Sequence, residues 1–232
     1  MTSSHAYGEG WYWDKRYSEE GAAGAFDWYQ KYSNLAPLLN LYIHRHHRVL
    51  VVGCGNSALS EGMVNNGYED VFNIDISSVV IEEMQKKYSN VPQLKYLKMD
   101  VRQMDAFEAG SFDAVVDKGT LDSILCGQNS RENAEKMLKE VARVLKDKGV
   151  YILITYGAPN YRVGLLRNMC SWTIKLHVID KIVPEESSDH QVWDVTSPIQ
   201  LDEEGTSAAS VLGKNPDVHY IYVCMKDDGS CS

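Results

Sequence analysis

Short β-branched runs alternate with helical patterns between residues 48 and 155, and this alternation limits the possible folds more than any other feature. The runs predicted to be strands are residues 48–53, 71–75, 94–99, 112–116 and 150–155. The stretches predicted to be helices are residues 58–66, 78–88 and 131–146. Alternation of this kind is typical of a parallel sheet with helices on both faces.

The alternation weakens after Tyr156, where one more helix is predicted over residues 161–169. Residues 172–182 and 218–225 have strand-like patterns and are predicted to close the sheet as an antiparallel pair. The sequence therefore predicts a doubly wound, Rossmann-like α/β fold. Its seven-stranded sheet is mostly parallel and ends in an antiparallel strand.

The 232 residues are predicted to form a single domain with three parts. Residues 1–47 form an aromatic helical cap, residues 48–157 form the core, and residues 158–232 close the sheet. The last part contains an insert, residues 182–213, that has no Lys or Arg and is interpreted as a loop. Its acidic residues are Glu185, Glu186, Asp189, Asp194, Asp202, Glu203 and Glu204.

The charge balance narrows the choice of partner. Lys and Arg number 23 against 32 Asp and Glu, so the net charge is -9. Binding to a phosphate backbone needs clustered cations, so we expect no nucleic acid and favour a cationic, small-molecule or protein partner.

Targeting and metal signals are weak. No stretch approaches the roughly 18 apolar residues of a membrane span, and the polar start over residues 1–10 does not resemble a signal peptide. The five cysteines are scattered, which favours a reducing compartment, the cytoplasm, and gives no zinc motif. His44, His46 and His47 cluster without a nearby ligand partner, so we expect a solvated helix end and no metal.

Glycines and acids follow the predicted strands in register. Gly53 and Gly55 follow the first strand and permit a tight turn close to a ligand. Asp75, Asp100 and Asp117 end the second, third and fourth strands. Ligands of doubly wound sheets bind outside these carboxyl ends, where Asp75 is suited to ribose hydroxyls.

Each signal has an alternative when taken alone. Gly53, Gly55 and Ala58 also fit the Gly-x-Gly-x-x-Ala fingerprint of an NAD-dependent oxidoreductase. An acid at a strand end is often a helix cap or a turn residue. The combination at successive strand ends favours a nucleotide-type site.

That combination resembles the class I S-adenosylmethionine-dependent methyltransferases. Residues 49–57, 73–77 and 98–101 look like that family's first motif, its ribose-binding motif and its adenine-contacting segment. Residues 144–151 look like the turn before the fifth strand, with Lys148 where Gly is common.

Residues 12–17, 26–29, 53–57 and 117–122 extend the resemblance to one subgroup, that of methyltransferase-like-13 and elongation-factor-1A lysine methyltransferase 4. The resemblance implies an enzyme that uses S-adenosyl-L-methionine to methylate a lysine of a protein, with elongation factor 1A as the expected partner. The implied cofactor contacts are Trp13, Tyr17, Trp28, Gly53, Asp75, Ile76, Asp100, Val101 and Lys118.

Asp117 and Asp122 are the candidate catalytic residues, because either carboxylate can steer an incoming ammonium or take its proton. Asp122 can equally cap the next helix. Likewise, the aromatic side chains of the cap can contact the cationic cofactor or simply pack a helical core.

Two other functions remain open: a methyltransferase for a small molecule, and a cofactor-binding module without catalysis. The sequence lacks the Asp/Asn-Pro-Pro-Tyr/Phe motif of many methyltransferases that act on nucleobase amines, which again disfavours nucleic acid.

Overall fold

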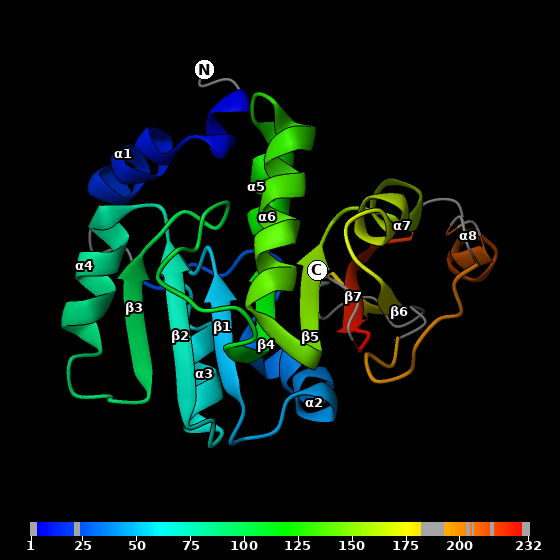
Figure 1. Cartoon of the computed structure of the whole chain (residues 1–232), viewed down its shortest axis with the longest axis horizontal. Helices are drawn as coiled ribbons and strands as arrows, with labels where there is room; N and C mark the ends of the chain where they lie inside the picture. The colour runs from blue at the N-terminus through cyan, green and yellow to red at the C-terminus, as the bar shows by residue number, and fades with distance from the viewer. Residues whose placement is uncertain are drawn as a thin grey trace, which may run out of the picture.

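Seven strands form one sheet in the computed structural model, which describes residues 4–20, 24–181, 193–202, 205, 207–213 and 216–228 (Figure 1). The sheet order is β3-β2-β1-β4-β5-β7-β6. The strands are β1 (Arg48–Val52), β2 (Asp70–Asp75), β3 (Leu94–Lys98), β4 (Phe112–Lys118), β5 (Leu145–Thr155), β6 (Trp172–Asp180) and β7 (Val218–Lys226).

The first five strands run parallel, whereas β7 pairs antiparallel with both β5 and β6. The predicted fold class is therefore confirmed, including the antiparallel pair that closes the sheet. The expected division into a cap, a core and a sheet-closing part remains a prediction.

The central strands are apolar throughout because both faces of the sheet are covered. Leu50 and Val52 of β1 belong to the core on one face, and Val49 and Val51 belong to the core on the other. Successive side chains of a strand point to opposite faces, so a continuous β-branched run suits a strand buried on both sides.

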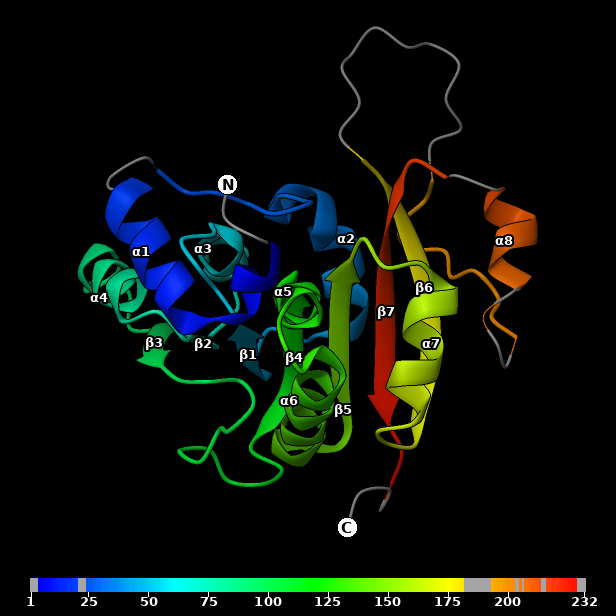
Figure 2. The same ribbon diagram turned by 90° about the horizontal axis from the view of Figure 1, so that it is seen from above.

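Helices cover the two faces separately (Figure 2). The core on one face contains buried residues of α2 (Tyr32–Tyr42), α3 (Leu59–Asn65) and α4 (Ser78–Lys87). The opposite core contains residues of α5 (Thr120–Cys126), α6 (Ser130–Val144), α7 (Pro159–Arg167) and α8 (Ser207–Leu212). The residues of α6 that lie in that core are Ala134, Met137, Leu138, Val141, Ala142 and Val144.

The strand order reverses between β1 and β4, which creates a switch point at their carboxyl ends. The amino-terminal elements η1 (Ser4–Gly8) and α1 (Gly10–Glu20) lie across this edge, where the parallel arrowheads point in Figure 1. Residues 24–31 connect α1 to α2 without helical structure, so the predicted cap is only partly helical.

Two helices differ from the sequence prediction. Helix α5 was not predicted, because it has only seven residues and begins directly after β4. Helix α8 lies in the insert interpreted as a loop, of which Glu185, Glu186, Asp189, Glu203 and Glu204 fall outside the described residues. Across the described ranges, every helix is too short or too polar to cross a membrane.

Lys148 lies in β5 with a φ of 64°. This left-handed conformation favours glycine, which gives a physical reason for the Gly that the family resemblance leads us to expect at this turn.

Candidate active site

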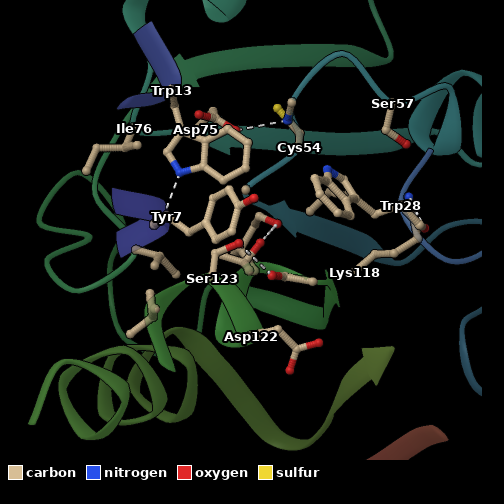
Figure 3. Close-up of a pocket in the computed structure, with 18 of the residues that line it drawn as sticks. Tyr7, Trp13, Trp28, Cys54, Ser57, Asp75, Ile76, Lys118, Asp122 and Ser123 are labelled. Carbon is tan, nitrogen blue, oxygen red and sulfur yellow. Dashed lines mark hydrogen bonds between the residues drawn. The ribbon is translucent and has the colours of Figure 1, made fainter. Parts of the chain in front are cut away.

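A pocket opens at the carboxyl ends of the parallel strands, beneath the amino-terminal elements (Figure 3). Every residue predicted to contact the cofactor lines it: Trp13, Tyr17, Trp28, Gly53, Asp75, Ile76, Asp100, Val101 and Lys118. Asp122 also lines the pocket, whereas Asp117 is not among its lining residues. The fold thus gathers residues from five separate stretches of the sequence at one site.

The turn after β1 requires glycine for steric reasons. Gly53 and Gly55 have φ values of 58° and 49°. A Cβ on Gly53 would lie 2.0 Å from Thr120 Oγ1, and one on Gly55 would lie 2.5 Å from the Tyr17 hydroxyl oxygen. The backbone is therefore held open to the pocket at a point where any side chain would collide with its neighbours.

Asp75 ends β2 inside the pocket and is only 7% exposed. Its carboxylate accepts one hydrogen bond from the Gly55 N–H and one from the Ser77 N–H, both at 2.9 Å. Burial raises the pKa of Asp75 above its usual value, and these two donors oppose that rise. Each oxygen keeps a lone pair, so the carboxylate can still accept hydrogen bonds from two hydroxyls of a ligand.

The side chain of Asp100 is largely engaged by a neighbour. Arg102 binds it through Nε at 2.9 Å and Nη2 at 2.7 Å. Burial raises the pKa of Asp100, but the hydrogen bonds from Arg102 outweigh this and hold it below its usual value. A ligand amino group would therefore share these oxygens with the guanidinium, while Ile76 and Val101 supply apolar surface beside them.

Aromatic rings from the amino-terminal part also line the pocket. Trp13 stacks on Tyr17 with ring centroids 6.0 Å apart, and its indole N–H donates to the Tyr7 carbonyl at 2.9 Å. The Arg16 guanidinium lies 5.6 Å from the Trp13 ring and 5.3 Å from the Trp28 ring. These rings thus already contact one cation, in the way that aromatic faces attract positive charge.

Lys118, the last residue of β4, binds the segment of residues 24–31 that connects α1 to α2. Its amine lies 3.2 Å from the Asp27 carboxylate and donates to the Trp28 carbonyl at 3.0 Å. Burial lowers the pKa of Lys118, and Asp27 opposes that lowering. The Ser57 hydroxyl donates to the same carboxylate, so Asp27 links the segment to two core elements.

Asp117 is completely buried and acts on the start of α5. It accepts hydrogen bonds from the Thr120 N–H at 2.8 Å, the Leu121 N–H at 3.2 Å and the Tyr151 hydroxyl at 2.8 Å. Burial raises the pKa of Asp117 to about 7. The capping role considered for Asp122 therefore falls to Asp117, whose oxygens satisfy free N–H groups at a helix start.

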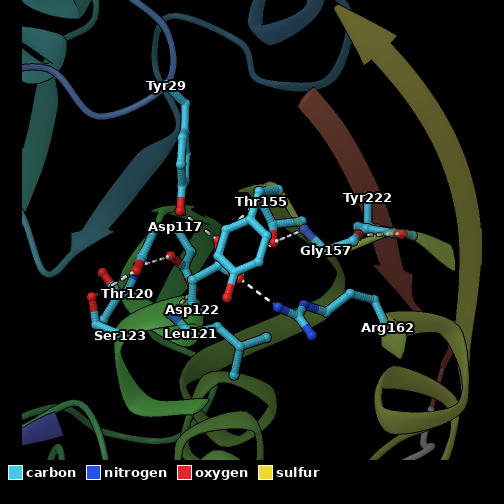
Figure 4. A network of polar contacts seen from close by, with 12 residues as sticks. Tyr29, Asp117, Thr120, Leu121, Asp122, Ser123, Thr155, Gly157, Arg162 and Tyr222 are labelled. Carbon is cyan, nitrogen blue, oxygen red and sulfur yellow. Dashed lines mark hydrogen bonds and ion pairs between the residues drawn. The ribbon is translucent and has the colours of Figure 1, made fainter. Parts of the chain in front are cut away.

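Asp122 lies in the first turn of α5 and is the centre of a polar network (Figure 4). Its carboxylate accepts from Tyr29, Thr155, Arg162 and the Tyr156 N–H. The pair with Arg162 is at 2.7 Å, and the two side chains are 8% and 4% exposed. A buried carboxylate of this kind is stable only because a cation and several donors compensate its charge.

Three residues of this region were not among the predicted site residues: Tyr29, Tyr156 and Arg162. Tyr29 and Tyr156 line the pocket, and Arg162 supports Asp122 from behind. Tyr29 is part of the 26–29 motif, so its sequence neighbours gave a signal. The sequence around Arg162 gave none.

The comparisons with known proteins agree with this architecture. Residues 50–153 match the family model described as a methyltransferase domain. EEF1A lysine methyltransferase 4 of mouse is 38% identical over 160 residues, which cover 66% of this chain and 62% of that protein. The chain belongs to the class I S-adenosylmethionine-dependent methyltransferases.

Longer relatives of this methyltransferase match over a small part of their length. The human eEF1A lysine and N-terminal methyltransferase is 38% identical over 182 residues, or 76% of this chain and 26% of that protein. The chain therefore spans about a quarter of the length of these relatives and less than two thirds of the shorter one.

Solved structures show the same fold at low sequence identity. A structure described as a possible histamine N-methyltransferase of Thermotoga maritima has a TM-score of 0.58 at 14% identity and covers 93% of this chain and all of its own. A TehB-like methyltransferase of Corynebacterium glutamicum has a TM-score of 0.56 at 14% identity, with coverage of 92% and 95%.

The residues of the methyltransferase pocket fit the family's cofactor. S-adenosylmethionine carries a ribose, an adenine ring and a charged sulfonium. The pocket offers a carboxylate with free lone pairs at Asp75, apolar surface at Ile76 and Val101, and aromatic rings that attract cations. The chemistry of this donor set suits both an adenosine group and a positive charge.

Proposed function

We propose that this chain transfers the methyl group of S-adenosylmethionine to the side-chain amine of a lysine in a protein, with elongation factor 1A as the first candidate substrate. The similarity to relatives named as methyltransferases of that factor, at 38% identity over 160 to 182 residues, carries this proposal. The cytoplasm is the location we propose with it.

Each pocket residue has a part in the proposed binding mode. Asp75 holds the ribose, Ile76 and Val101 pack on the adenine, and Asp100 accepts from the adenine amino group. The backbone at Gly53 approaches the methionine tail, since a side chain there would be blocked by Thr120.

The aromatic residues Trp13, Tyr17 and Trp28 enclose the cationic end in this proposal. Lys118 supports them indirectly, because it binds the carbonyl of Trp28 and the carboxylate of Asp27. The bound cofactor supplies an electrophilic methyl group on a positively charged sulfur.

The acceptor must arrive as a neutral amine. Its nitrogen lone pair forms the new N–C bond while the S–C bond breaks and that electron pair remains on sulfur. The reference pKa of a lysine amine is about 10.4, and burial among aromatic rings lowers it. Alignment of nitrogen, methyl carbon and sulfur then supplies much of the rate, because the displacement is in line.

Incubation with radiolabelled S-adenosylmethionine tests the proposal, first on purified elongation factor 1A and then on a cell lysate. We expect one labelled protein band, with the label on lysine after hydrolysis and amino-acid analysis. Label confined to the low-mass fraction would indicate a small-molecule methyltransferase. Cofactor binding without transfer to any fraction would indicate a binding module.

A further inference from the structure

Tyr29 has a backbone conformation that bulky residues rarely adopt. Its φ is 64°, in the left-handed region, where an aromatic side chain is a clear outlier. Such strain persists only where the surroundings enforce it, and it clusters at functional sites. The position of this one ring is therefore worth explaining.

Two contacts of the Tyr29 ring and one of the next residue fix its position. It packs on the His219 ring at a centroid distance of 4.9 Å. It also lies against Gly119, where an added Cβ would be only 3.2 Å from the Tyr29 ring. The next residue, Gln30, is buried and donates to the Asp180 carbonyl at 2.7 Å.

The Tyr29 hydroxyl donates to Asp122 Oδ2 at 2.8 Å (Figure 4). Burial and the neighbouring Asp122 raise the pKa of Tyr29, so the phenol stays protonated and its single hydrogen is used by that carboxylate. The phenol oxygen then retains lone pairs that can accept a hydrogen bond at the pocket wall.

Both carboxylate oxygens of Asp122 are already engaged by neighbouring donors. Oδ1 accepts from the Thr155 hydroxyl at 2.6 Å and from Arg162 Nη2 at 2.7 Å. Oδ2 accepts from Tyr29 and from the Tyr156 N–H at 3.3 Å. With both oxygens occupied and the charge compensated by Arg162, this carboxylate is arranged to orient its partners.

Tyr29 and Asp122 lie at the end of the pocket where the acceptor is expected. Asp75 ends β2, whereas Gly119 and Asp122 follow β4, on the other side of β1 in the sheet. A ligand with its ribose at Asp75 that extends past Gly53 therefore brings its reacting end toward β4.

We propose that the Tyr29 hydroxyl is the acceptor-binding group of this pocket: it accepts a hydrogen bond from an N–H of the incoming neutral amine, while Asp122, supported by Arg162 and Thr155, holds its hydrogen and fixes its direction. The ligand class is a primary alkyl amine, such as a lysine side chain. This inference rests on the proposed function and is an alternative to the expectation that Asp117 or Asp122 steers the ammonium or takes its proton.

The test compares Tyr29→Phe with wild type and with Tyr161→Phe, a control that removes a hydroxyl from a side chain 70% exposed and outside the pocket lining. Two quantities are measured: the methylation rate on elongation factor 1A, and the affinity for S-adenosylhomocysteine by calorimetry. In Tyr29→Phe we expect kcat/KM to fall about 10-fold, the size expected for loss of one neutral hydrogen bond to the acceptor. The affinity should stay within about twofold, since Asp75 is untouched.

A second variant, Thr155→Val, removes one donor to Asp122 without touching the acceptor. We expect a smaller loss of kcat, an unchanged cofactor KM and unchanged affinity for S-adenosylhomocysteine. A lower kcat with unchanged cofactor binding indicates a positioning role, because general damage to the fold would lower both. Thr155→Val also keeps the proposal testable if Tyr29→Phe does not fold.

The possible failures are distinguishable. If wild type methylates lysine and Tyr29→Phe does so equally well, the role of Tyr29 is wrong and the proposed function stands. If Tyr29→Phe loses affinity for S-adenosylhomocysteine in step with its rate, the hydroxyl acts on the cofactor and this proposal is overturned. If wild type binds the cofactor product but labels no lysine, the proposed function fails and the acceptor role fails with it.

Discussion

The two halves of the pocket are built in different ways. We call the ends of β1 to β3 with Gly53, Gly55 and Asp75 the ribose half, and the ends of β4 and β5 with Tyr29 and Asp122 the acceptor half. In the ribose half, Asp75 binds the N–H groups of Gly55 and Ser77, which are 20 and 2 residues away. In the acceptor half, Asp122 binds side chains 93 and 40 residues away.

The contrast shows that the ribose half depends on backbone groups near β1 and β2, whereas the acceptor half depends on side chains brought together from distant parts of the sequence. The acceptor half exists only after residues 24–31, α5 and α7 have all reached their places, so we expect it to respond far more strongly to single side-chain changes.

Arg162→Met should give the largest effect. It leaves the Asp122 carboxylate buried without its cation, which costs about 3–5 kcal/mol of folding free energy. Chemical denaturation measures this loss. The control Arg131→Met removes an exposed i,i+4 pair with Glu135 and should cost about 0.5 kcal/mol or less. Equal costs for both variants would mean that no buried pair holds the acceptor half together.

Asp75→Ala should leave the acceptor half intact and damage only the ribose half. Loss of two charge-assisted hydrogen bonds to ribose hydroxyls predicts about 100-fold weaker binding of S-adenosylhomocysteine, or about 2.7 kcal/mol. Calorimetry provides the measurement. Asp70→Ala, at the other end of the same strand, is the matched control because its ion pair with Lys95 is part-exposed. An unchanged affinity of Asp75→Ala for S-adenosylhomocysteine would refute the ribose assignment.

The pH dependence of stability should reveal the buried carboxyl that caps α5. The pKa of Asp117 is raised from 3.8 to about 7, so the folded chain holds this proton more tightly than the unfolded chain. The contribution of protonated Asp117 to the free energy of unfolding is complete below pH 3.8. It is lost as the pH rises to about 7, by up to about 1.4 kcal/mol per pH unit.

Asp117→Asn should remove this pH-dependent contribution to stability. Unfolding curves recorded between pH 3.8 and about 7 measure the change. Asp113→Asn serves as a contrast of opposite sign. Burial raises the pKa of Asp113, but Lys146 and the Arg48 N–H outweigh this and lower it. Ionised Asp113 therefore stabilises the fold at higher pH. In Asp113→Asn, the free energy of unfolding should rise less with pH than it does in wild type. Identical profiles for wild type and Asp117→Asn would contradict the raised pKa.

Lys148→Gly should give the smallest effect and acts as a reference for Tyr29. Both residues have a φ of 64°, but Lys148 is exposed and lies outside the pocket lining. Relief of the left-handed backbone, partly offset by the greater freedom of glycine when unfolded, should stabilise the chain by about 0.5 kcal/mol. Thermal unfolding can measure this shift. Destabilisation would show that positive φ alone is not a source of strain here.

The sequence predicted that Gly53, Gly55 and Asp75 lie together at one edge of the sheet because their signals are local, and their roles toward a ligand remain predictions. The positions of Gly53, Gly55 and Asp75 follow from a strand, a turn and the next strand, and residue patterns report such features directly. The mostly parallel sheet with its antiparallel closing pair was also predicted, since alternation and right-handed connections leave few arrangements, whereas the strand order was not predicted.

The acceptor half was predicted poorly because its geometry depends on contacts that no local pattern records. Asp117 and Asp122 were both recognised as candidates, yet nothing in their spacing shows which one caps α5 and which one faces Tyr29. Helix α5 is too short for a periodic signal, and Arg162 lies in a helix whose sequence gives no hint of a buried ion pair.

Residues 24–31 contact both halves at once. Asn56 binds the Gly24 carbonyl and the Phe26 N–H near the ribose half, and Lys118 binds the Trp28 carbonyl near the acceptor half. This single short segment therefore contributes to both halves of the pocket. Any displacement of these eight residues would move contacts of both halves at once, because the segment that Asn56 binds also carries Tyr29 to Asp122. Under the proposed function, a change made near the nucleoside is therefore expected to reach the acceptor as well.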